Sequence, residues 1–466
     1  MLGMGNMRQW LMNISLVGGW FPAAAFAVVA VLSVILLVSA AVSKRDGRIL
    51  ATVLPIGVEA VSGMVGYVVA WLLSDVFVVF GVGLGSRVMA WVAAGFAIAG
   101  FAIVHIVLSR GMMRVAAAIL TVFAILAAAI GIDQSYGEYA TIGSLFGEDS
   151  YSQADLTGLA KRKDLITVAQ WRKQAANGTI RNIPANGTVN KIDIPATKSQ
   201  FEARKALVYL PPAALADSKR KPALPVVLML SGQPGSPGRV FQAGGIQTMM
   251  DGYAKTHDGL APIVIAADQL GADSHNTLCV DSKVYGNALT YLTQDVVDWV
   301  KTNLPAAQDA KDWAIAGFSQ GATCSLQIGV NHPDLFGTMI PTDSEIKPTN
   351  GSRQEMIDRF FDGDTTAYEN QVPVNAIRNH APTHQMLIIG AGEKDTTSIR
   401  NVKTIAPVAA KAGMRVAAVE SSGNAHDWHA VQDVLRYGLA VFGHDTGLDG
   451  ANPNLSDYPN LKRITI

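Results

Sequence analysis

Residues 313–330 read WAIAGFSQGATCSLQIGV, a short apolar run followed by the pentapeptide GFSQG and then by a helix-compatible stretch. This order predicts a strand, a sharp turn and a helix, which is the setting of a nucleophilic serine. The turn strains the backbone of Ser319, and small residues two positions before and after it let strand and helix approach closely. We therefore expect Ser319 to be a nucleophile; the alternative interpretation is a serine in an ordinary glycine turn.

The apolar residues are concentrated at the start of the chain. The 466-residue sequence has a positive mean hydropathy, and only 16% of its residues are charged. Lys plus Arg and Asp plus Glu both number 37, so no global charge favours a nucleic-acid partner. Four stretches of the first 132 residues are long enough to cross about 30 Å of hydrocarbon as helices, which predicts a four-helix transmembrane domain over 1–132. These stretches are 20–42, 50–73, 88–108 and 115–132.

Basic residues cluster in two of the connections between the expected spans. Lys44, Arg45 and Arg48 follow the first span, and Arg110 and Arg114 follow the third. The positive-inside rule assigns both connections to the cytoplasm. Because the number of spans is even, everything after residue 132 is expected outside the cytoplasm, in a multi-pass protein of the cell membrane.

Two ionisable residues interrupt the expected spans, Glu59 and His105. Ionisable groups inside a membrane are functional candidates, and these two could form a pair. We prefer a structural interpretation, with His105 near the cytoplasmic interface and Glu59 bonded inside the helix bundle, because nothing else in the sequence suggests transport.

The only two cysteines, Cys279 and Cys324, both fall in the part assigned to the oxidising side of the membrane. A disulfide is compatible with that compartment and would tie an active-site loop to the helix after Ser319. Two unlinked buried cysteines are equally compatible with the spacing.

Beyond residue 132 the sequence changes character twice. Residues 133–185 read as a polar connector, residues 186–446 alternate short apolar runs with helix-compatible segments, and residues 447–466 read as a tail. The alternation predicts an α/β fold with a doubly wound, mostly parallel sheet, in which ligands bind at the carboxyl ends of the strands. The expected strands are 189–194, 205–210, 225–230, 262–267, 313–316, 338–340, 385–389 and 415–420.

An acid and a base follow the last two expected strands, so the chain order is serine, acid, histidine. His426 is the preferred base and His429, one turn further on, its nearest rival. Asp395 is preferred to Glu393 as the acid, because the turn needs several residues to reach back towards the histidine. A serine hydroxyl needs a neutral imidazole to take its proton, and the imidazole needs a carboxylate to fix its tautomer. Two histidines that precede a strand are expected to be structural, at the other end of the sheet: His380 and His384.

Two backbone N–H groups are needed to stabilise the oxyanion. Gln320, directly after the nucleophile, is expected to supply one of them. The other is expected from the loop 231–238, where Gln233 is preferred and Gly232 is the second choice. A plain glycine and proline turn is the alternative interpretation of that loop.

Residues 225–443 resemble the putative-esterase branch of the α/β-hydrolase superfamily, which includes secreted mycolyltransferases of actinobacteria and bacterial esterases. The shared features are GFSQG at 317–321, HPDLF at 332–336 and GNAHDW at 423–428. The resemblance implies a triad of Ser319, His426 and a carboxylate after the strand that ends at Ile389. It also implies acyl-ester hydrolysis or acyl transfer. Mycolyltransferases are secreted, so the four helices suggest a tethered relative. The spacing of the acid departs from the mycolyltransferase pattern, which keeps Glu393 open.

Together these features predict a membrane-anchored serine esterase that acts outside the cytoplasm on lipid- or envelope-linked acyl esters, with no cofactor and no metal. Acyl transfer to a sugar or lipid hydroxyl is the second hypothesis, and an inactive hydrolase fold that serves as an envelope binding or scaffold module is the third. The polar segment 341–384 is expected to form a lid or acyl-binding wall, or else a plain pair of surface helices.

Overall fold

The computed structural model of the chain describes residues 4–42, 48–77, 84–148, 151–160, 162–180 and 182–466. The chain forms two compact units. One comprises Met1–Glu148 with the short segment Ala425–Asp427, and the other comprises Asp149–Asn424 and Trp428–Ile466. We call them the helical unit and the sheet unit. By connectivity, Ala425–Asp427 is part of a loop that leaves and re-enters the sheet unit.

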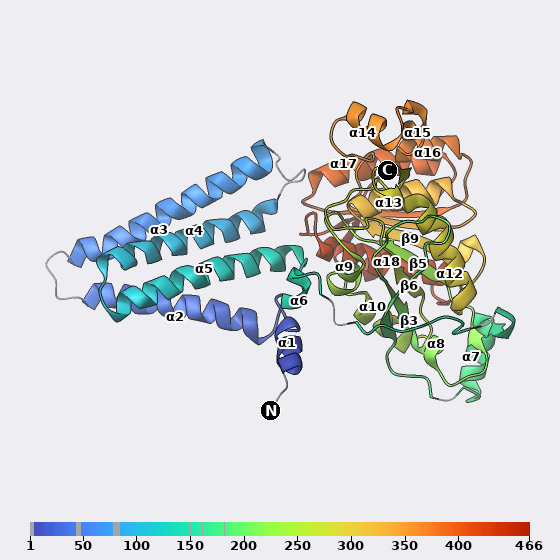
Figure 1. Cartoon of the computed structure of the whole chain (residues 1–466), viewed down its shortest axis with the longest axis horizontal. Helices are drawn as coiled ribbons and strands as arrows, with labels where there is room; N and C mark the ends of the chain where they lie inside the picture. Colours follow the sequence, from blue (N-terminus) through green and yellow to red (C-terminus); the bar gives the residue numbers. More distant parts are fainter. Residues whose placement is uncertain (1–3, 43–47, 78–83, 149–150, 161, 181) are drawn as a thin grey trace. The chain divides into compact units, whose positions relative to one another are not determined.

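The helical unit contains four long apolar helices, as the hydropathy predicted, and each is long and apolar enough to cross a membrane. Figure 1 shows them running alongside one another. The second candidate span covers Val53–Val76, because α3 continues into a π-helical turn at Leu72–Val76. The third candidate span is α4. The four helices are α2 Trp20–Val42, α3 Arg48–Trp71, α4 Gly85–Leu108 and α5 Met112–Tyr136, and a short helix, α1 Met4–Met12, precedes them.

Small residues let α3 and α4 pack closely. A Cβ added at Gly66 would lie 2.7 Å from Cβ of Phe96, and one added at Gly100 would collide with Ser62. Close approach through small residues is how helices associate where lipid removes the hydrophobic driving force. The face that α4 turns towards α2 and α5 carries Phe101 and Ala102, which are buried together with Leu36 and Leu120.

The two ionisable residues that interrupt the expected spans, Glu59 and His105, do not form a pair. His105 is buried and its ring lies 4.5 Å from the ring of Phe101, whereas Glu59 is partly exposed on α3. Within the described part of the chain, no hydrogen bond or ion pair links the two side chains. Lys44 and Arg45 of the first basic connection lie outside the described residues.

The sheet unit is built on a nine-stranded sheet in the order β13-β12-β11-β10-β9-β5-β6-β3-β2. Its six central strands, β12 to β6 in that order, are parallel, and β2, β3 and β13 are antiparallel to their neighbours. This arrangement confirms the predicted doubly wound, mostly parallel sheet. The strands are β2 Thr188–Ile192, β3 Ala206–Leu210, β5 Val226–Leu230, β6 Ile263–Ala266, β9 Trp313–Phe318, β10 Thr338–Thr342, β11 Met386–Gly392, β12 Arg415–Ser421 and β13 Leu461–Arg463.

Helices cover both faces of this sheet, which is why its central strands are continuous apolar runs. Every residue of β5, β9 and β10 is buried. One face packs against α9, α10 and α18, and the other against α12, α13 and α17 (Figure 1). The helices are α9 Pro237–Gln242, α10 Ile246–Lys255, α12 Val296–Asn303, α13 Gln320–Asn331, α17 Thr396–Lys411 and α18 Trp428–Asp445.

Two segments without a strong pattern in the sequence belong to this fold. The segment expected to be a tail supplies β13, which pairs with β12 so that Lys462 lies opposite Glu420. In the segment expected to be a connector, α7 (Val168–Ala176) carries the fully buried Trp171, whose Nε1 donates to the carbonyl oxygen of Asp258 at 3.1 Å. The tail and the later part of the expected connector therefore belong to the sheet unit, whereas the connector's first part, up to Glu148, belongs to the helical unit.

Three short helices are inserted between β10 and β11: α14 Arg353–Phe360, α15 Thr365–Glu369 and α16 Pro373–Asn379. Residues of α14 and α15, including Ile357 and Tyr368, form a small apolar core with Leu278 and Val280 from the segment after β6. The insertion thus packs on the segment that follows β6, a strand separated from β10 by β9 and β5.

Candidate active site

Ser319 lies between the end of β9 and the start of α13, in the predicted strand, turn and helix. Its φ of 55° and ψ of −117° are rarely adopted by residues other than glycine, and such strain clusters at functional sites. Glycine is required on both sides of the turn. A Cβ at Gly317 would collide with the carbonyl oxygen of Gly321, and one at Gly321 would collide with that of Ser231.

The loop after β5 passes directly beside the serine. A Cβ added at Gly232 would lie 3.5 Å from Cβ of Ser319. Gln320 begins α13, where the backbone N–H groups have no partner within the helix. Gln233 follows Gly232, and its side chain points to the carbonyl oxygen of Ser274 at 3.4 Å. The structure therefore brings both parts of the predicted oxyanion site together, and the choice between Gln233 and Gly232 stays a prediction.

A buried glutamine connects these two parts. Gln269 Nε2 donates to the carbonyl oxygen of Ser231 at 2.7 Å and to Oε1 of Gln320 at 3.2 Å. Gln320 Nε2 in turn donates to Oδ1 of Asn276 at 3.3 Å. Sequence reasoning missed Gln269, although its position directly after β6, at the carboxyl end of a central strand, was a usable signal.

A buried ion pair holds the same loop from the other side. Asp268 is fully buried and accepts from Nε of Arg204 at 2.9 Å and from Nη2 at 2.7 Å. The Arg204 Nη2 also donates to the carbonyl oxygen of Gly235 at 2.9 Å. A bidentate guanidinium contact fixes geometry as well as charge, so Arg204 fastens the loop after β5 to the end of β6.

The preferred acid and base are close to one another. Carboxylate oxygens of Asp343 and Asp395 and a ring nitrogen of His426 all lie within 4.8 Å of one another. Asp395 caps α17, with Oδ1 accepting from the backbone N–H of Ser398 at 3.0 Å. His426 lies in the loop between β12 and α18.

Asp343 was not expected from the sequence. It follows β10 directly, is fully buried and has a φ of 55°. Its backbone N–H donates to the carbonyl oxygen of Gly390 at 2.9 Å, and its Oδ1 accepts from the backbone N–H of Gly392 at 2.9 Å. The signal was again a polar residue at the carboxyl end of an expected strand, hidden because residues 341–384 were interpreted as a lid or surface segment.

Glu393, the second choice for the acid, has other partners. Its Oε2 accepts from the backbone N–H of Gly423 at 2.7 Å and its Oε1 from Nζ of Lys462 at 3.0 Å. The Gly423 hydrogen bond and then Lys462 lower the pKa of this exposed carboxyl group. Glu393 therefore links the β12–α18 loop to β13 through these two hydrogen bonds.

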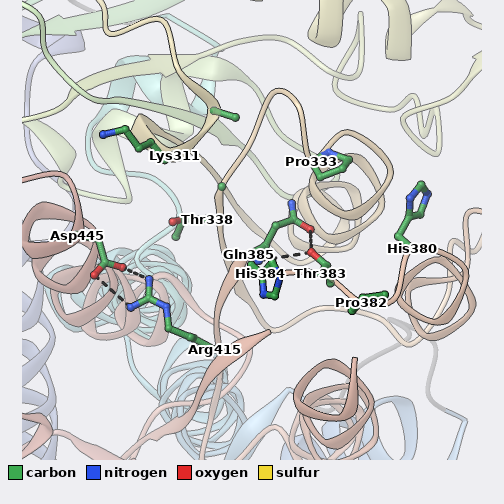
Figure 2. A pocket seen from close by; sticks show the side chains of 12 residues that line it. Lys311, Pro333, Thr338, His380, Pro382, Thr383, His384, Gln385, Arg415 and Asp445 are labelled. Carbon is green, nitrogen blue, oxygen red and sulfur yellow. Dashed lines mark hydrogen bonds and ion pairs between the residues drawn. The ribbon is translucent and has the colours of Figure 1, made fainter. Parts of the chain in front are cut away.

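The remaining histidines that the sequence singled out lie elsewhere. His429 is in the first turn of α18. His380 and His384 lie at the amino ends of the strands, where they line a cavity of about 520 Å³ (Figure 2). Figure 2 also shows the ion pair between Arg415 and Asp445 on the wall of this cavity. The cavity is at the edge of the sheet opposite Ser319.

The two cysteines form a disulfide with a Cα–Cα distance of 5.7 Å. Both are buried, and the bond joins the segment after β6 to α13. Gln320 Nε2 lies 3.7 Å from Sγ of Cys279. The disulfide therefore contacts the hydrogen-bonded side chains of Gln320 and Gln269 next to the loop 231–238.

The group of Asp343, Asp395 and His426 is also compact enough for its atoms to hold one metal ion. Carboxylate and imidazole ligands suit Zn²⁺ and related ions. An acid, a histidine and a serine are the groups that nucleophilic acyl chemistry needs, and Ser319 follows β9 at the same end of the strands as Asp343 and Asp395.

Comparison with known proteins gives the family of the chain. A family model described as "Putative esterase" matches residues 198–438. An uncharacterised protein of Corynebacterium glutamicum is 32% identical over 333 residues, which cover 70% of this chain and 74% of that protein. Among solved structures, an S-formylglutathione hydrolase from Agrobacterium tumefaciens matches with a TM-score of 0.46 at 16% identity, covering 57% of this chain and 98% of that one. The MPT51 protein of Mycobacterium tuberculosis matches with a TM-score of 0.40 at 14% identity, covering 55% of this chain and 98% of that one.

Proposed function

Because the chain belongs to the putative esterase family, and is thus an esterase or acyltransferase, we propose that it is a membrane-anchored serine ester hydrolase. Its substrates are lipid- or envelope-linked acyl esters outside the cytoplasm. The observation that carries the proposal is the strained Ser319 at the β9–α13 turn, at the same edge of the sheet as the cluster of Asp395 and His426.

In the proposed reaction, Ser319 Oγ attacks the ester carbonyl carbon while His426 accepts the hydroxyl proton. Asp395 holds the imidazole in the required tautomer and stabilises the imidazolium. Backbone N–H groups of Gln320 and of the loop at Gly232 and Gln233 bind the oxyanion. The alcohol leaves with the proton from His426, and water then cleaves the acyl-enzyme by the same steps in reverse.

The membrane part of the proposal is supported by four helices long and apolar enough to cross a bilayer. Arg110 and Arg114 flank the turn between α4 and α5, which favours a cytoplasmic position for that turn. The sheet unit then lies on the opposite side, where a disulfide such as Cys279–Cys324 persists. Anchoring raises the effective concentration of a substrate carried by the same membrane.

The nucleophile is tested with a fluorophosphonate probe on the full-length protein in detergent. We expect covalent labelling of the parent, loss of labelling in Ser319→Ala, and a fall in ester turnover of about 10⁴-fold or more. Ser325→Ala on the same helix is the matched control, because that hydroxyl donates to the carbonyl oxygen of Ala322. Equal labelling of Ser319→Ala and the parent would overturn the proposal.

Hydrolysis and transfer are separated by product analysis of one acyl ester, with and without an added sugar or long-chain alcohol. The hydrolase proposal expects free acid as the main product in both reactions. Capture of most of the acyl group by the added hydroxyl would reassign the protein to acyl transfer.

Sidedness is tested with an impermeant thiol reagent on intact cells. The native cysteines are bridged, so reaction requires an engineered thiol. We expect Thr188→Cys, exposed on β2, to react, and Ser109→Cys, at the end of α4, to be protected. The reverse pattern would place the sheet unit in the cytoplasm.

A further inference from the structure

The short helix α1 and the segment after α5 pack on each other at one end of the helical unit (Figure 1). The backbone N–H of Leu16 donates to the carbonyl oxygen of Ala140 at 3.0 Å, and the backbone N–H of Ile142 donates to the carbonyl oxygen of Ile14 at 2.9 Å. Ile14 and Leu16 are buried. Because these bonds join the chain before α2 to the chain after α5, α1 is held at the end of the unit where α2 begins and α5 ends.

Helix α1 is separate from the first candidate span. Its nine residues extend about 14 Å, which is less than half of the hydrocarbon thickness. Residues 13–19 follow it before α2 begins, and Gly19 has a φ of 83°. The chain folds back there, so that the ring of Trp10 stacks on the ring of Trp20, with centroids 6.4 Å apart and planes 14° apart. Helix α1 therefore does not prolong α2.

One face of α1 is apolar and exposed. Met7, Trp10 and Leu11 are spaced as i, i+3 and i+4, so they share a face of the helix. All three side chains are exposed, Trp10 to 58%. Gln9 lies on the opposite face by the same spacing. We call Met7, Trp10 and Leu11 the α1 face.

The α1 face is continuous with the outer surface of the first candidate span. Trp20, on which Trp10 stacks, is the first residue of α2 and is 61% exposed. Further along α2, exposed apolar side chains such as Val31 and Val34 form the surface that lipid would contact. Two more exposed apolar side chains, Leu145 and Phe146, come from the end of α6 (Ile142–Leu145), which packs on α1.

The composition of α1 favours a membrane surface as the partner of this face. Tryptophan is enriched at the boundary between membrane and water, because its ring is apolar and its N–H is polar. A helix with Trp and Leu on one face and polar residues on the other lies in the plane of that boundary. The only charged residue in α1 is Arg8, which forms an ion pair with Glu148. Contact with lipid is therefore expected to depend on apolar area and not on lipid charge.

We propose that the α1 face, together with Trp20, is a lipid-docking surface that lies between the headgroups and the acyl chains of the membrane crossed by the four spans. Because Arg8 pairs with Glu148, docking of α1 also fixes the level at which the chain leaves the helical unit. The inference rests on the proposed membrane insertion and adds a contact with the membrane surface that ester hydrolysis does not require.

The test uses the full-length protein in phosphatidylcholine vesicles, with a nitroxide label on one engineered cysteine at a time. The native cysteines are bridged and do not react. Relaxation of the label by oxygen, which concentrates among the acyl chains, and by a water-soluble nickel chelate gives its depth. Met7→Cys is expected to place the label about 5–10 Å below the headgroup boundary. Gln9→Cys is the matched control on the opposite face and is expected to contact water, and Val31→Cys in the middle of α2 is expected to be deeply buried in lipid.

Two further measurements test the chemistry of the contact. In the Met7→Cys background, Trp10→Ser is expected to shift the label towards water, whereas Gln9→Ser leaves its depth unchanged. The depth is also expected to be the same in vesicles that contain an anionic lipid and at high salt, because Arg8 is already paired. Insertion of the Met7 label only with anionic lipid, or an equal effect of the two serine variants, overturns the apolar docking.

The outcomes separate the docking surface from the insertion of the spans. A label at Met7 as accessible to the nickel chelate as the label at Gln9, with Val31 deep in lipid, overturns the docking and keeps the insertion. A label at Met7 shielded from both reagents shows that protein, either the sheet unit or a second copy of the chain, covers the face, and this also overturns the docking. A label at Val31 in water refutes the insertion and the docking with it. None of these results bears on Ser319, which the fluorophosphonate probe tests.

Discussion

In the nine-stranded sheet, the carboxyl ends of the strands (the carboxyl edge) and their amino ends (the amino edge) carry different kinds of residues. The carboxyl edge carries Ser319, Asp343 and Asp395, which are strained or buried and held by specific hydrogen bonds. The amino edge has an open cavity of about 520 Å³ lined by largely exposed side chains such as Lys311 and Arg415. A cavity alone is therefore a weaker indication of a functional site than several buried polar groups that converge from different loops.

The reason for the difference lies in the winding of the chain. In the sheet, β6 lies on one side of β5, and β9, β10 and β11 lie on the other, so the strand order switches at β5. Because these strands are parallel, the loops that follow them all lie at the carboxyl end of the sheet, around this switch point. These loops carry the polar residues described above, and hydrogen bonds such as that from Gln269 to Ser231 link one loop to the next. The following predictions test this contrast between the edges.

Among the variants that compare the two ends of the strands, the largest effect on activity is expected from Asp395→Asn, which removes the carboxylate proposed to orient His426. Its kcat/KM is expected to fall about 10³–10⁴-fold. Glu393→Gln, two residues away, keeps an acceptor for Gly423 N–H and is expected to change kcat/KM by less than about tenfold. Turnover of a p-nitrophenyl ester by the two variants measures the difference, and a larger loss in Glu393→Gln would exchange the two roles.

Gly321→Ala is expected to lower the free energy of unfolding by about 4 kcal/mol, because its Cβ would collide with backbone oxygens of Ser231 and Leu230. Gly252→Ala on α10 is the control, since no atom lies within 4 Å of the added Cβ. There a small stabilisation of about 0.5–1 kcal/mol is expected. Chemical unfolding of both variants tests whether the turn tolerates a side chain; equal stabilities would contradict the packing.

Replacing both Cys279 and Cys324 by Ser is expected to lower stability by about 2–4 kcal/mol, because the bond closes a loop with a sequence separation of 45. Thermal unfolding with and without reductant measures the effect. Reductant should destabilise the parent and leave the double variant unchanged. A parent insensitive to complete reduction would show that the bond adds no stability.

The same substitution can be made at both edges. Arg204→Lys loses the bidentate contact with Asp268 that holds Gly235, and kcat/KM is expected to fall by about tenfold. Arg415→Lys loses a comparable contact with Asp445 beside the cavity and should leave kcat/KM unchanged. Inhibition by a boronic acid reports the oxyanion site directly, and it should weaken only in Arg204→Lys. Equal losses in both variants would remove the distinction between the edges.

The sequence predicted the central strands because burial on both faces leaves continuous apolar runs such as Val226–Leu230. It predicted the strand, turn and helix around Ser319 because the turn needs glycine at fixed positions. It did not predict β13, whose short LKR sequence carries two charged side chains and no alternation. Arg204 and Asp268 were missed because they meet only when β3 lies beside β6, which local sequence does not determine. Asp343 and Asp395 likewise meet through the pairing of β10 with β11.

The insertion between β10 and β11 has a consequence for how relatives of this chain can diverge. Its helices α14 and α15 have a small core of their own, in which Ile357 and Tyr368 pack on Leu278 and Val280. Between these two residues lies Cys279, which is bonded to Cys324 of α13. A segment with its own core can change length and composition without repacking the sheet beneath Ser319. Evolution can therefore remodel this surface as a separate module while the proposed reacting groups stay in place.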